Sequence, residues 1–282
     1  MLTMNLRKVS AAAACALALS VTAAACGSDD DSGDSGDGGG KDKITIGIKF
    51  DQPGLGLKEP DGSYSGFDVD VATYVAKELG YSEDQIEWKE AISADRETML
   101  ERGDVDMIAA TYSITDEREQ KVDFAGPYLL AHQDLLIRAD DDITKGEDLN
   151  GKTLCSVTGS TSAQNVKDTI APKAQLAERP GYSECLDAVA SGSIDALTTD
   201  DSILAGYAAQ EANKGKFKLA GLNLSNENYG VGVKKGDEKM KTDVDAALEK
   251  MVSDGSWEKF MDANLGPANY DFEPAPKIGD IK

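Results

Sequence analysis

The chain has 282 residues, of which 29 are Lys or Arg and 51 are Asp or Glu, so its formal net charge is −22. This acidic balance excludes nucleic acid as a partner, because phosphate binding requires a basic surface that releases counterions. One histidine and four cysteines disfavour a metal site and the Ser-His or Cys-His relays of most hydrolases, so we expect neither a metal nor a cofactor. The length suffices for one large folded domain or two modest ones.

The first 25 residues have the pattern of a secretory signal peptide. Arg7 and Lys8 precede an apolar, alanine-rich stretch over residues 9–25, which ends in three alanines directly before Cys26. This order is typical of a segment removed during export, and the alanines before the cysteine resemble a bacterial lipobox. We therefore expect cleavage before Cys26 and a lipid on its thiol. The alternative is an uncleaved membrane helix, for which this stretch is marginal because the hydrocarbon core is about 30 Å thick.

Residues 27–43 contain only Gly, Asp, Ser and Lys. Because such a segment buries no apolar surface, it cannot repay the entropy of ordering the chain. We expect a flexible linker whose ends lie roughly 20 to 25 Å apart, which lets a tethered body reach a partner in the membrane. A spacer that serves no partner fits the same composition.

The rest of the chain alternates strand and helix patterns. Ile44, Ile46 and Ile48 alternate with Thr45 and Gly47, which is the period of a half-buried strand. Two series of such units follow each other in β-α-β order, which indicates an α/β protein with two lobes. In chain order we expect strands at 44–48, 86–88, 106–110, 153–157, 176–178 and 195–198, and helices at 68–79, 96–102, from 162, and at 184–191, 201–212, 240–251 and 257–265.

Six short motifs occur in one order along this body. Any one of them is a weak signal, but six with natural spacing are specific. They are GFDVDVA at 66–72, SIT at 113–115 followed by Arg118, VDFA at 122–125 followed by PY at 127–128, LNGK at 149–152, TGST at 158–161 and GSIDA at 192–196.

Together these motifs resemble the polar amino-acid branch of bacterial solute-binding proteins, family 3, which serve ABC importers. The resemblance runs from about residue 44 to residue 265. It implies an α/β type II periplasmic-binding fold, in which two lobes are joined by a two-strand hinge and a ligand cleft lies between them. Lobe 1 would comprise residues 44–138 and 226–282, and lobe 2 residues 139–225.

The cleft of an amino-acid receptor must neutralise a zwitterion, because withdrawing charges from water is costly unless each meets an opposite charge. The resemblance places Arg118, a planar bidentate donor, on the α-carboxylate and Asp200 on the α-ammonium. From the residues alone, Arg118 also fits a solvated acidic run at 116–119, and Asp200 and Ser160 also fit helix caps. Further donors to the carboxylate are expected from the hydroxyls of Thr111 and Ser113 and from Ser160 and Thr161, which open a helix.

Two further cations predict an acidic side chain on the ligand. Lys49 follows the first strand and Arg96 begins a helix, and both positions resemble those where acidic amino-acid binders of the family carry cations. A neutral amide would leave such a desolvated cation unpaired. We therefore expect glutamate, or aspartate, as the ligand, with glutamine or another polar amino acid as the alternative; each cation taken alone fits a surface residue. The expected cleft walls also include Tyr182 on the far side and Phe50, Asp51 and Gln52 on the near side.

Two cysteines of the body, Cys155 and Cys185, fall in the expected lobe 2. Outside the membrane such a pair suggests a disulfide, which would stabilise the lobe by roughly 3 to 4 kcal/mol in the chain-entropy model. His132 is expected to be structural, although the sequence identifies no partner for it.

The resemblance implies a monomeric receptor, anchored by lipid to the outer face of the bacterial cell membrane, that passes its amino acid to the permease of an ABC importer. An enzyme of the same fold, similar to known dehydratases, is an alternative that the single histidine weakens. A sensor without transport is a second alternative.

Overall fold

The computed structural model describes residues 43–281. The expected signal peptide over residues 1–25, the expected lipidation site Cys26, and the expected linker apart from Lys43 lie outside the described residues. The described residues belong to one compact unit. Its strands are β1 (Ile44–Ile48), β2 (Asp51–Gln52), β3 (Gly56–Lys58), β4 (Tyr64–Ser65), β5 (Ile86–Glu90), β6 (Met107–Ile108), β7 (Val122–Arg138), β8 (Thr153–Val157), β9 (Gln175–Arg179), β10 (Ala196–Asp200), β11 (Phe217–Leu219) and β12 (Asn226–Lys234).

Helices begin where glycines and polar residues interrupt the strands. Gly66, directly before the first helix, has φ +121°, and a Cβ atom there would lie 2.1 Å from the carbonyl oxygen of Leu55, so only glycine fits. Among residues 43–281, no helix is both long enough and apolar enough to cross a membrane. The helices are α1 (Phe67–Glu78), α2 (Arg96–Arg102), α3 (Asp116–Glu119), α4 (Ser162–Asn165), α5 (Tyr182–Ala190), α6 (Asp201–Ala209), α7 (Glu238–Ser253) and α8 (Ser256–Asn264).

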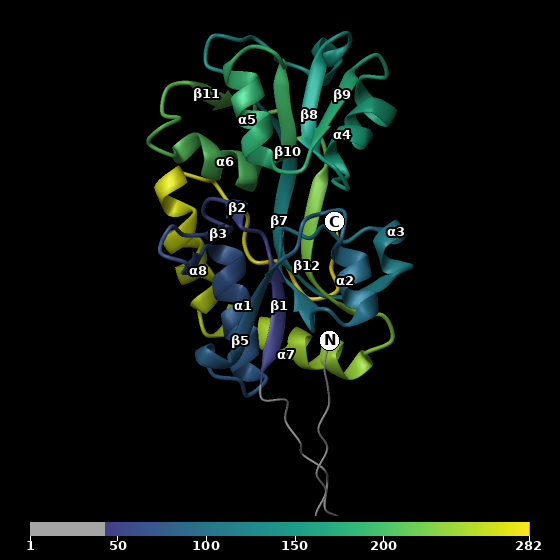
Figure 1. Ribbon diagram of the computed structural model, residues 1–282, viewed down its shortest axis with the longest axis vertical. Helices are drawn as coiled ribbons and strands as arrows, with labels where there is room; N and C mark the ends of the chain where they lie inside the picture. The colour runs from purple at the N-terminus through teal and green to yellow at the C-terminus, as the bar shows by residue number, and fades with distance from the viewer. Residues whose placement is uncertain (1–42, 282) are drawn as a thin grey trace, which may run out of the picture. The chain divides into compact units, whose positions relative to one another are not determined.

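The main sheet has two halves that share one long strand. Its order is β5-β1-β6-β12-β7-β10-β8-β9, and β11 pairs with β7 beyond this path. β1 runs parallel to β5 and β6, and β8 runs parallel to β9 and β10, whereas β7 is antiparallel to β10, β11 and β12. Figure 1 shows β7 passing from the half that carries α1 and α2 to the half that carries α4, α5 and α6.

The partner of β7 changes between His132 and Gln133. Up to His132 the strand pairs with β12, and from Gln133 it pairs with β10. We call the part with β1, β5, β6 and β12 the first half and the part with β8 to β11 the second half. The sequence places the lobe boundary at residue 138, but β7 continues through the crossing without a break because its second part finds a new partner strand. The helices α7 and α8 pack on α1, so both ends of the described chain build the first half.

His132, at this crossing, has three polar partners. Its backbone N–H donates to Oδ1 of Asp201 at 3.0 Å, Nδ1 lies 3.0 Å from Oδ1 of Asn226, and Nε2 lies 3.2 Å from Oε1 of Glu273. The ring therefore joins β7 to β12 and to the C-terminal segment, which supplies the partners that the sequence did not identify.

Most expected elements are confirmed within two residues, whereas the helix expected over 201–212 ends three residues earlier, at Ala209. The helix expected from residue 162 is α-helical only to Asn165 and continues with a wider turn over Val166–Ile170. The strand over residues 122–138 was not expected as one element, because nearly all of its residues are buried and its sequence shows no alternation of polar and apolar residues.

Candidate functional site

A small polar cavity of about 10 Å³ lies between the two halves. The first half contributes residues at α2, α3 and the segment after β6, and the second half contributes the starts of α4 and α5 and the end of β10. Every residue expected at the cleft lines this cavity, except Lys49 and the near-wall residues Phe50, Asp51 and Gln52. The lining residues are Ser93, Arg96, Thr111, Ser113, Arg118, Ser160, Thr161, Ser162, Tyr182, Asp200 and Ile203.

Two buried guanidinium groups dominate the first-half wall. Arg96 is 2% exposed and Arg118 is 8% exposed. The guanidinium carbon of each lies 5.0 Å from the ring centroid of Tyr112. Arg118 is partly neutralised, because its Nε lies 3.6 Å from Oε1 of Glu97 and its Nη1 donates to the carbonyl oxygen of Ser113 at 2.8 Å.

Arg96 lacks such compensation. Its Nε donates to the carbonyl oxygen of Ala91 at 3.3 Å, and among residues 43–281 it forms no ion pair within 4.0 Å with a carboxylate. Burial lowers the pKa of Arg96, and the nearby charge of Arg118 lowers it further. A desolvated cation without a counter-charge is costly, so the wall is chemically suited to an anion.

Lys49 lies outside the cavity lining and is paired within its own half. It is 1% exposed, and its Nζ lies 3.1 Å from Oδ1 of Asp51. Burial lowers the pKa of Lys49, the charge of Asp51 opposes that shift, and the charge of Arg96 adds to it. Lys49 therefore contributes positive potential near Arg96 from behind the wall.

None of the residues expected at the near wall, Phe50, Asp51 and Gln52, lines this cavity. The ring of Phe50 packs against Tyr64, with centroids 5.0 Å apart. Gln52 is 1% exposed and accepts a hydrogen bond from Oγ1 of Thr111 at 3.2 Å, so it supports a lining residue from behind.

Asp200, at the end of β10, is the buried acid of the second-half wall. It is 4% exposed, and its Oδ2 accepts a hydrogen bond from the hydroxyl of Tyr229. Burial raises the pKa of Asp200 well above its usual value, and the charges of Glu227 and Asp201 raise it further. Burial, and then the charge of Asp200, raise the pKa of Tyr182 to about 12. A cation placed beside Asp200 would relieve this unfavourable charge.

The expected hydroxyl residues of the second half stand at the start of α4. Thr161 directly precedes the helix, and the Oγ of Ser160 accepts a hydrogen bond from the backbone N–H of Ser162 at 3.3 Å. Ser93, Ser162 and Ile203 also line the cavity, although the sequence did not single them out. Ser162 directly follows the TGST motif, which is the signal that would have identified it.

Asp68 is a supporting residue that the sequence did not assign to the site. Its carboxylate accepts hydrogen bonds from the backbone N–H of Thr111 at 2.8 Å and from the hydroxyl of Tyr128 at 2.7 Å. Thr111 has φ +46°, a conformation that is uncommon for residues other than glycine. Burial raises the pKa of Asp68 to about 6. Asp68 thus fixes the backbone that carries Thr111 to the cavity wall.

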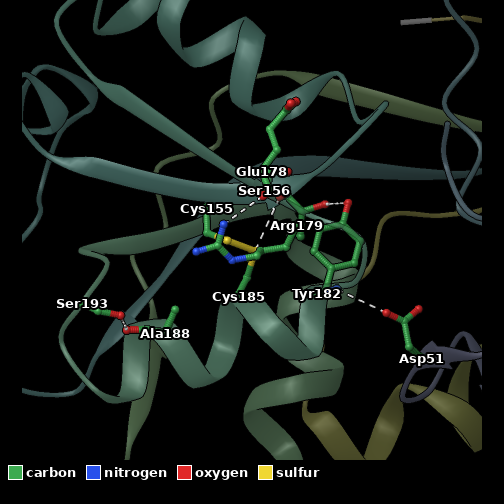
Figure 2. The surroundings of a disulfide bond; sticks show 10 residues. Asp51, Cys155, Ser156, Glu178, Arg179, Tyr182, Cys185, Ala188 and Ser193 are labelled. Carbon is green, nitrogen blue, oxygen red and sulfur yellow. Dashed lines mark hydrogen bonds between the residues drawn. A yellow bond between two sulfur atoms is a disulfide. The ribbon is translucent and has the colours of Figure 1, made fainter.

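The two halves touch each other at residues next to the cavity lining. Nη2 of Arg118 donates to the carbonyl oxygen of Gly159 at 3.2 Å, and a Cβ atom at Gly159 would lie 2.7 Å from the backbone of Ala94. Oδ2 of Asp51 accepts a hydrogen bond from the backbone N–H of Tyr182 at 3.2 Å, as Figure 2 shows. The halves therefore stand in close contact.

A disulfide joins Cys155 in β8 to Cys185 in α5, with Cα atoms 5.5 Å apart. Figure 2 shows the bond one turn of α5 beyond Tyr182, which lines the cavity. The crosslink ties the start of α5 to the sheet of the second half and so steadies that part of the wall.

Comparisons with known proteins identify relatives of this chain by sequence and by fold. The family model for bacterial extracellular solute-binding proteins, family 3, matches residues 44–267. The chain is 51% identical to a glutamate-binding protein of Corynebacterium efficiens, over 79% of each chain. It is 41% identical to the glutamine-binding protein of an ABC transporter of Bacillus subtilis, over 77% of this chain and 79% of the relative. Among solved structures, an ancestral arginine-binding protein bound to arginine matches with a TM-score of 0.74 and 32% identity, over 80% of this chain and 99% of the other.

Proposed function

Because the chain belongs to the bacterial extracellular solute-binding proteins of family 3 and has the type II periplasmic-binding fold, we propose that it captures L-glutamate for an ABC importer. The observation that carries this proposal is Arg96, a buried cation without a carboxylate partner within 4.0 Å among the described residues. An amino acid with a second carboxylate supplies that missing charge. The 51% identity with a glutamate-binding relative supports the same choice.

In this proposal the α-carboxylate binds Arg118, and the hydroxyls of Thr111 and Ser113 complete its hydrogen bonds. The planar guanidinium suits a carboxylate because it donates two parallel hydrogen bonds. Ser160 and Thr161 add donors from the second half, so closure of the two halves encloses the carboxylate.

The α-ammonium binds Asp200, and the side-chain carboxylate binds Arg96. Because Lys49 lies behind the wall and is paired with Asp51, it supports the acidic side chain through charge rather than by direct contact. Aspartate has the same charges on a shorter chain and is the second ligand of choice. Glutamine is the alternative favoured by the 41% identical relative.

We further propose that the mature protein begins at lipidated Cys26, stands as a monomer on the outer face of the cell membrane, and hands its ligand to a membrane permease. The segment before Cys26 and the apolar-free composition of residues 27–43 support this arrangement. The protein binds its ligand without chemical change, so mass spectrometry of the released ligand should recover it intact.

Calorimetric titration of ligand-free protein with L-glutamate, L-aspartate, L-glutamine and L-arginine tests the proposal. Glutamate should bind at least about tenfold more tightly than glutamine, since an unpaired buried charge costs upward of 1.4 kcal/mol. Tight binding of glutamine or arginine with no binding of glutamate would contradict it.

Replacing Gly159 with Ala should weaken glutamate binding at least about tenfold, because the new methyl group would overlap the backbone of Ala94 in the other half and hold the halves apart. Gly151→Ala is the matched control, since Gly151 has φ +83° against +81° at Gly159 and nothing within 4 Å of its Cβ position. Both variants should lose about 1 kcal/mol of stability from backbone strain, but only Gly159→Ala should lose affinity. Equal affinities of the two variants would show that the halves do not close at Gly159.

A further inference from the structure

The two arginines of the cavity share one aromatic ring that itself lies outside the cavity lining. The guanidinium carbons of Arg96 and Arg118 each lie 5.0 Å from the centroid of Tyr112, whose side chain is fully buried. At this distance a guanidinium is attracted to the electron-rich face of an aromatic ring. Tyr112 therefore lies against both arginines to which the proposal assigns the ligand's two carboxylates.

Tyr112 is held firmly in place. Its hydroxyl donates to Oε1 of Glu97 at 2.9 Å, and its ring meets the ring of Phe124 edge-on, with centroids 4.7 Å apart. On the sheet side, a Cβ atom at Gly232 would lie 2.8 Å from Cε1 of the tyrosine, so the ring lies against the bare backbone of β12. A ring fixed on these sides offers a rigid surface to both guanidinium groups.

The shared ring matters because Arg96 and Arg118 are both positively charged and buried, so water screens their mutual repulsion only weakly. Glu97 lies 3.6 Å from Arg118 but forms no ion pair within 4.0 Å with Arg96, so Arg96 depends most on the ring. Without the ring, the repulsion would turn the two side chains away from each other and away from the cavity.

We propose that Tyr112 is a positioning residue that holds Arg96 and Arg118 toward the cavity and thereby sets the preference for an acidic over an amide side chain. This inference rests on the proposed function, since it assumes a ligand with two carboxylates. Glutamate uses both arginines and glutamine uses only Arg118, so loss of the ring weakens glutamate more than glutamine.

Three variants test the inference by calorimetric titration with both ligands. Tyr112→Phe keeps the ring and should hold both affinities within about threefold of the unchanged protein. Tyr112→Leu removes the ring and should lower the affinity for glutamate roughly tenfold more than that for glutamine. Tyr112→Met fills the same space with an unbranched side chain and replaces the leucine variant if that one does not fold. A purely structural role of Tyr112 predicts equal losses for the two ligands, and that result would overturn the inference, as would a phenylalanine variant as impaired as the leucine variant.

A ligand-free measurement separates this inference from the proposed function. Protons of a guanidinium held over an aromatic face are shifted upfield by the ring current. The Arg96 and Arg118 side-chain signals in NMR spectra should show this shift in the unchanged protein and in Tyr112→Phe, and lose it in Tyr112→Leu or Tyr112→Met. If the shifts are present but glutamate does not bind, the proposed function fails and the placement of the arginines stands. If the shifts are absent from the unchanged protein, the inference fails whatever the ligand.

Discussion

Replacing Asp200 with Asn should stabilise the ligand-free protein at neutral pH and weaken glutamate binding at least about 100-fold. Both effects have one cause, which is the burial of this carboxylate beside Glu227 and Asp201. An amide avoids the cost of a desolvated negative charge, so the ligand-free protein becomes more stable to unfolding. The same amide cannot balance the ligand's ammonium, and breaking a buried ion pair by removing one partner costs about 3 to 5 kcal/mol.

The raised pKa of Asp200 explains why Asp200→Asn should stabilise the ligand-free protein. The pKa of Asp200 is raised in the folded protein above the value of about 3.9 for an unfolded chain. The stability that Asp200 contributes is therefore complete below pH 3.9 and is lost as the pH rises through the raised pKa. Thermal unfolding of the ligand-free protein should show that the advantage of Asp200→Asn grows as the pH rises from 4 toward neutral.

Ligand binding should reverse this shift. The ammonium of glutamate favours the ionised carboxylate, so binding lowers the pKa of Asp200 and releases a proton at pH values below the raised pKa. Glutamate affinity should fall as the pH falls through that range. Titrations in buffers of different ionisation enthalpy measure the released proton, which should be reduced in Asp200→Asn.

Asp201→Asn is the control for this pair of effects. Asp201 is the next residue and is also a partly buried acid, but it lies outside the cavity lining and accepts hydrogen bonds from His132 and Tyr270. The affinity of Asp201→Asn for glutamate should stay within about threefold of that of the unchanged protein. If Asp200→Asn binds as tightly as Asp201→Asn does, the ammonium has another acceptor.

The fold was predictable where local patterns are strong. Alternating isoleucines predicted β1 with its observed bounds, Ile44–Ile48, and the stripe of apolar residues ending at Gly80 predicted α1 within one residue. β7 was not predictable in this way, because a strand buried on both faces has no alternation to read. Its change of partner at His132 depends on where β10 and β12 lie, and local sequence does not carry that information.

Site residues could be predicted where the resemblance to the family assigns them a role. Arg118 and Asp200 follow from the resemblance, and both line the cavity. The expected contact of Lys49 with the ligand stays a prediction, since Lys49 lies outside the cavity lining and its Nζ lies 3.1 Å from Oδ1 of Asp51. Tyr112 and Asp68 were missed because they act on other residues of the site, and such contacts become visible only when distant segments are brought together.

Arg96→Met should abolish the preference for glutamate over glutamine and raise the stability of the ligand-free protein. Arg96 is 2% exposed and forms no ion pair within 4.0 Å with a carboxylate among residues 43–281, so the ring of Tyr112 and the more distant charge of Glu97 compensate its desolvated charge only in part. Methionine keeps an apolar stem of similar shape and removes the charge. Replacing an uncompensated buried ion with an apolar residue often stabilises by about 1 to 4 kcal/mol.

The Arg96→Met substitution should lower the affinity for glutamate only. Glutamate should bind at least about 100-fold more weakly to Arg96→Met, because its side-chain carboxylate is then desolvated without a counter-charge. The affinity for glutamine, which does not use that charge, should change by less than about threefold.

The control is Arg102→Met, which removes the same charge from the exposed end of the same helix and should alter neither affinity. Titration with both amino acids and thermal unfolding of the three ligand-free proteins check these outcomes. An equal loss for glutamate and glutamine would move Arg96 from the side chain of the ligand to its α-carboxylate, because that group is common to both.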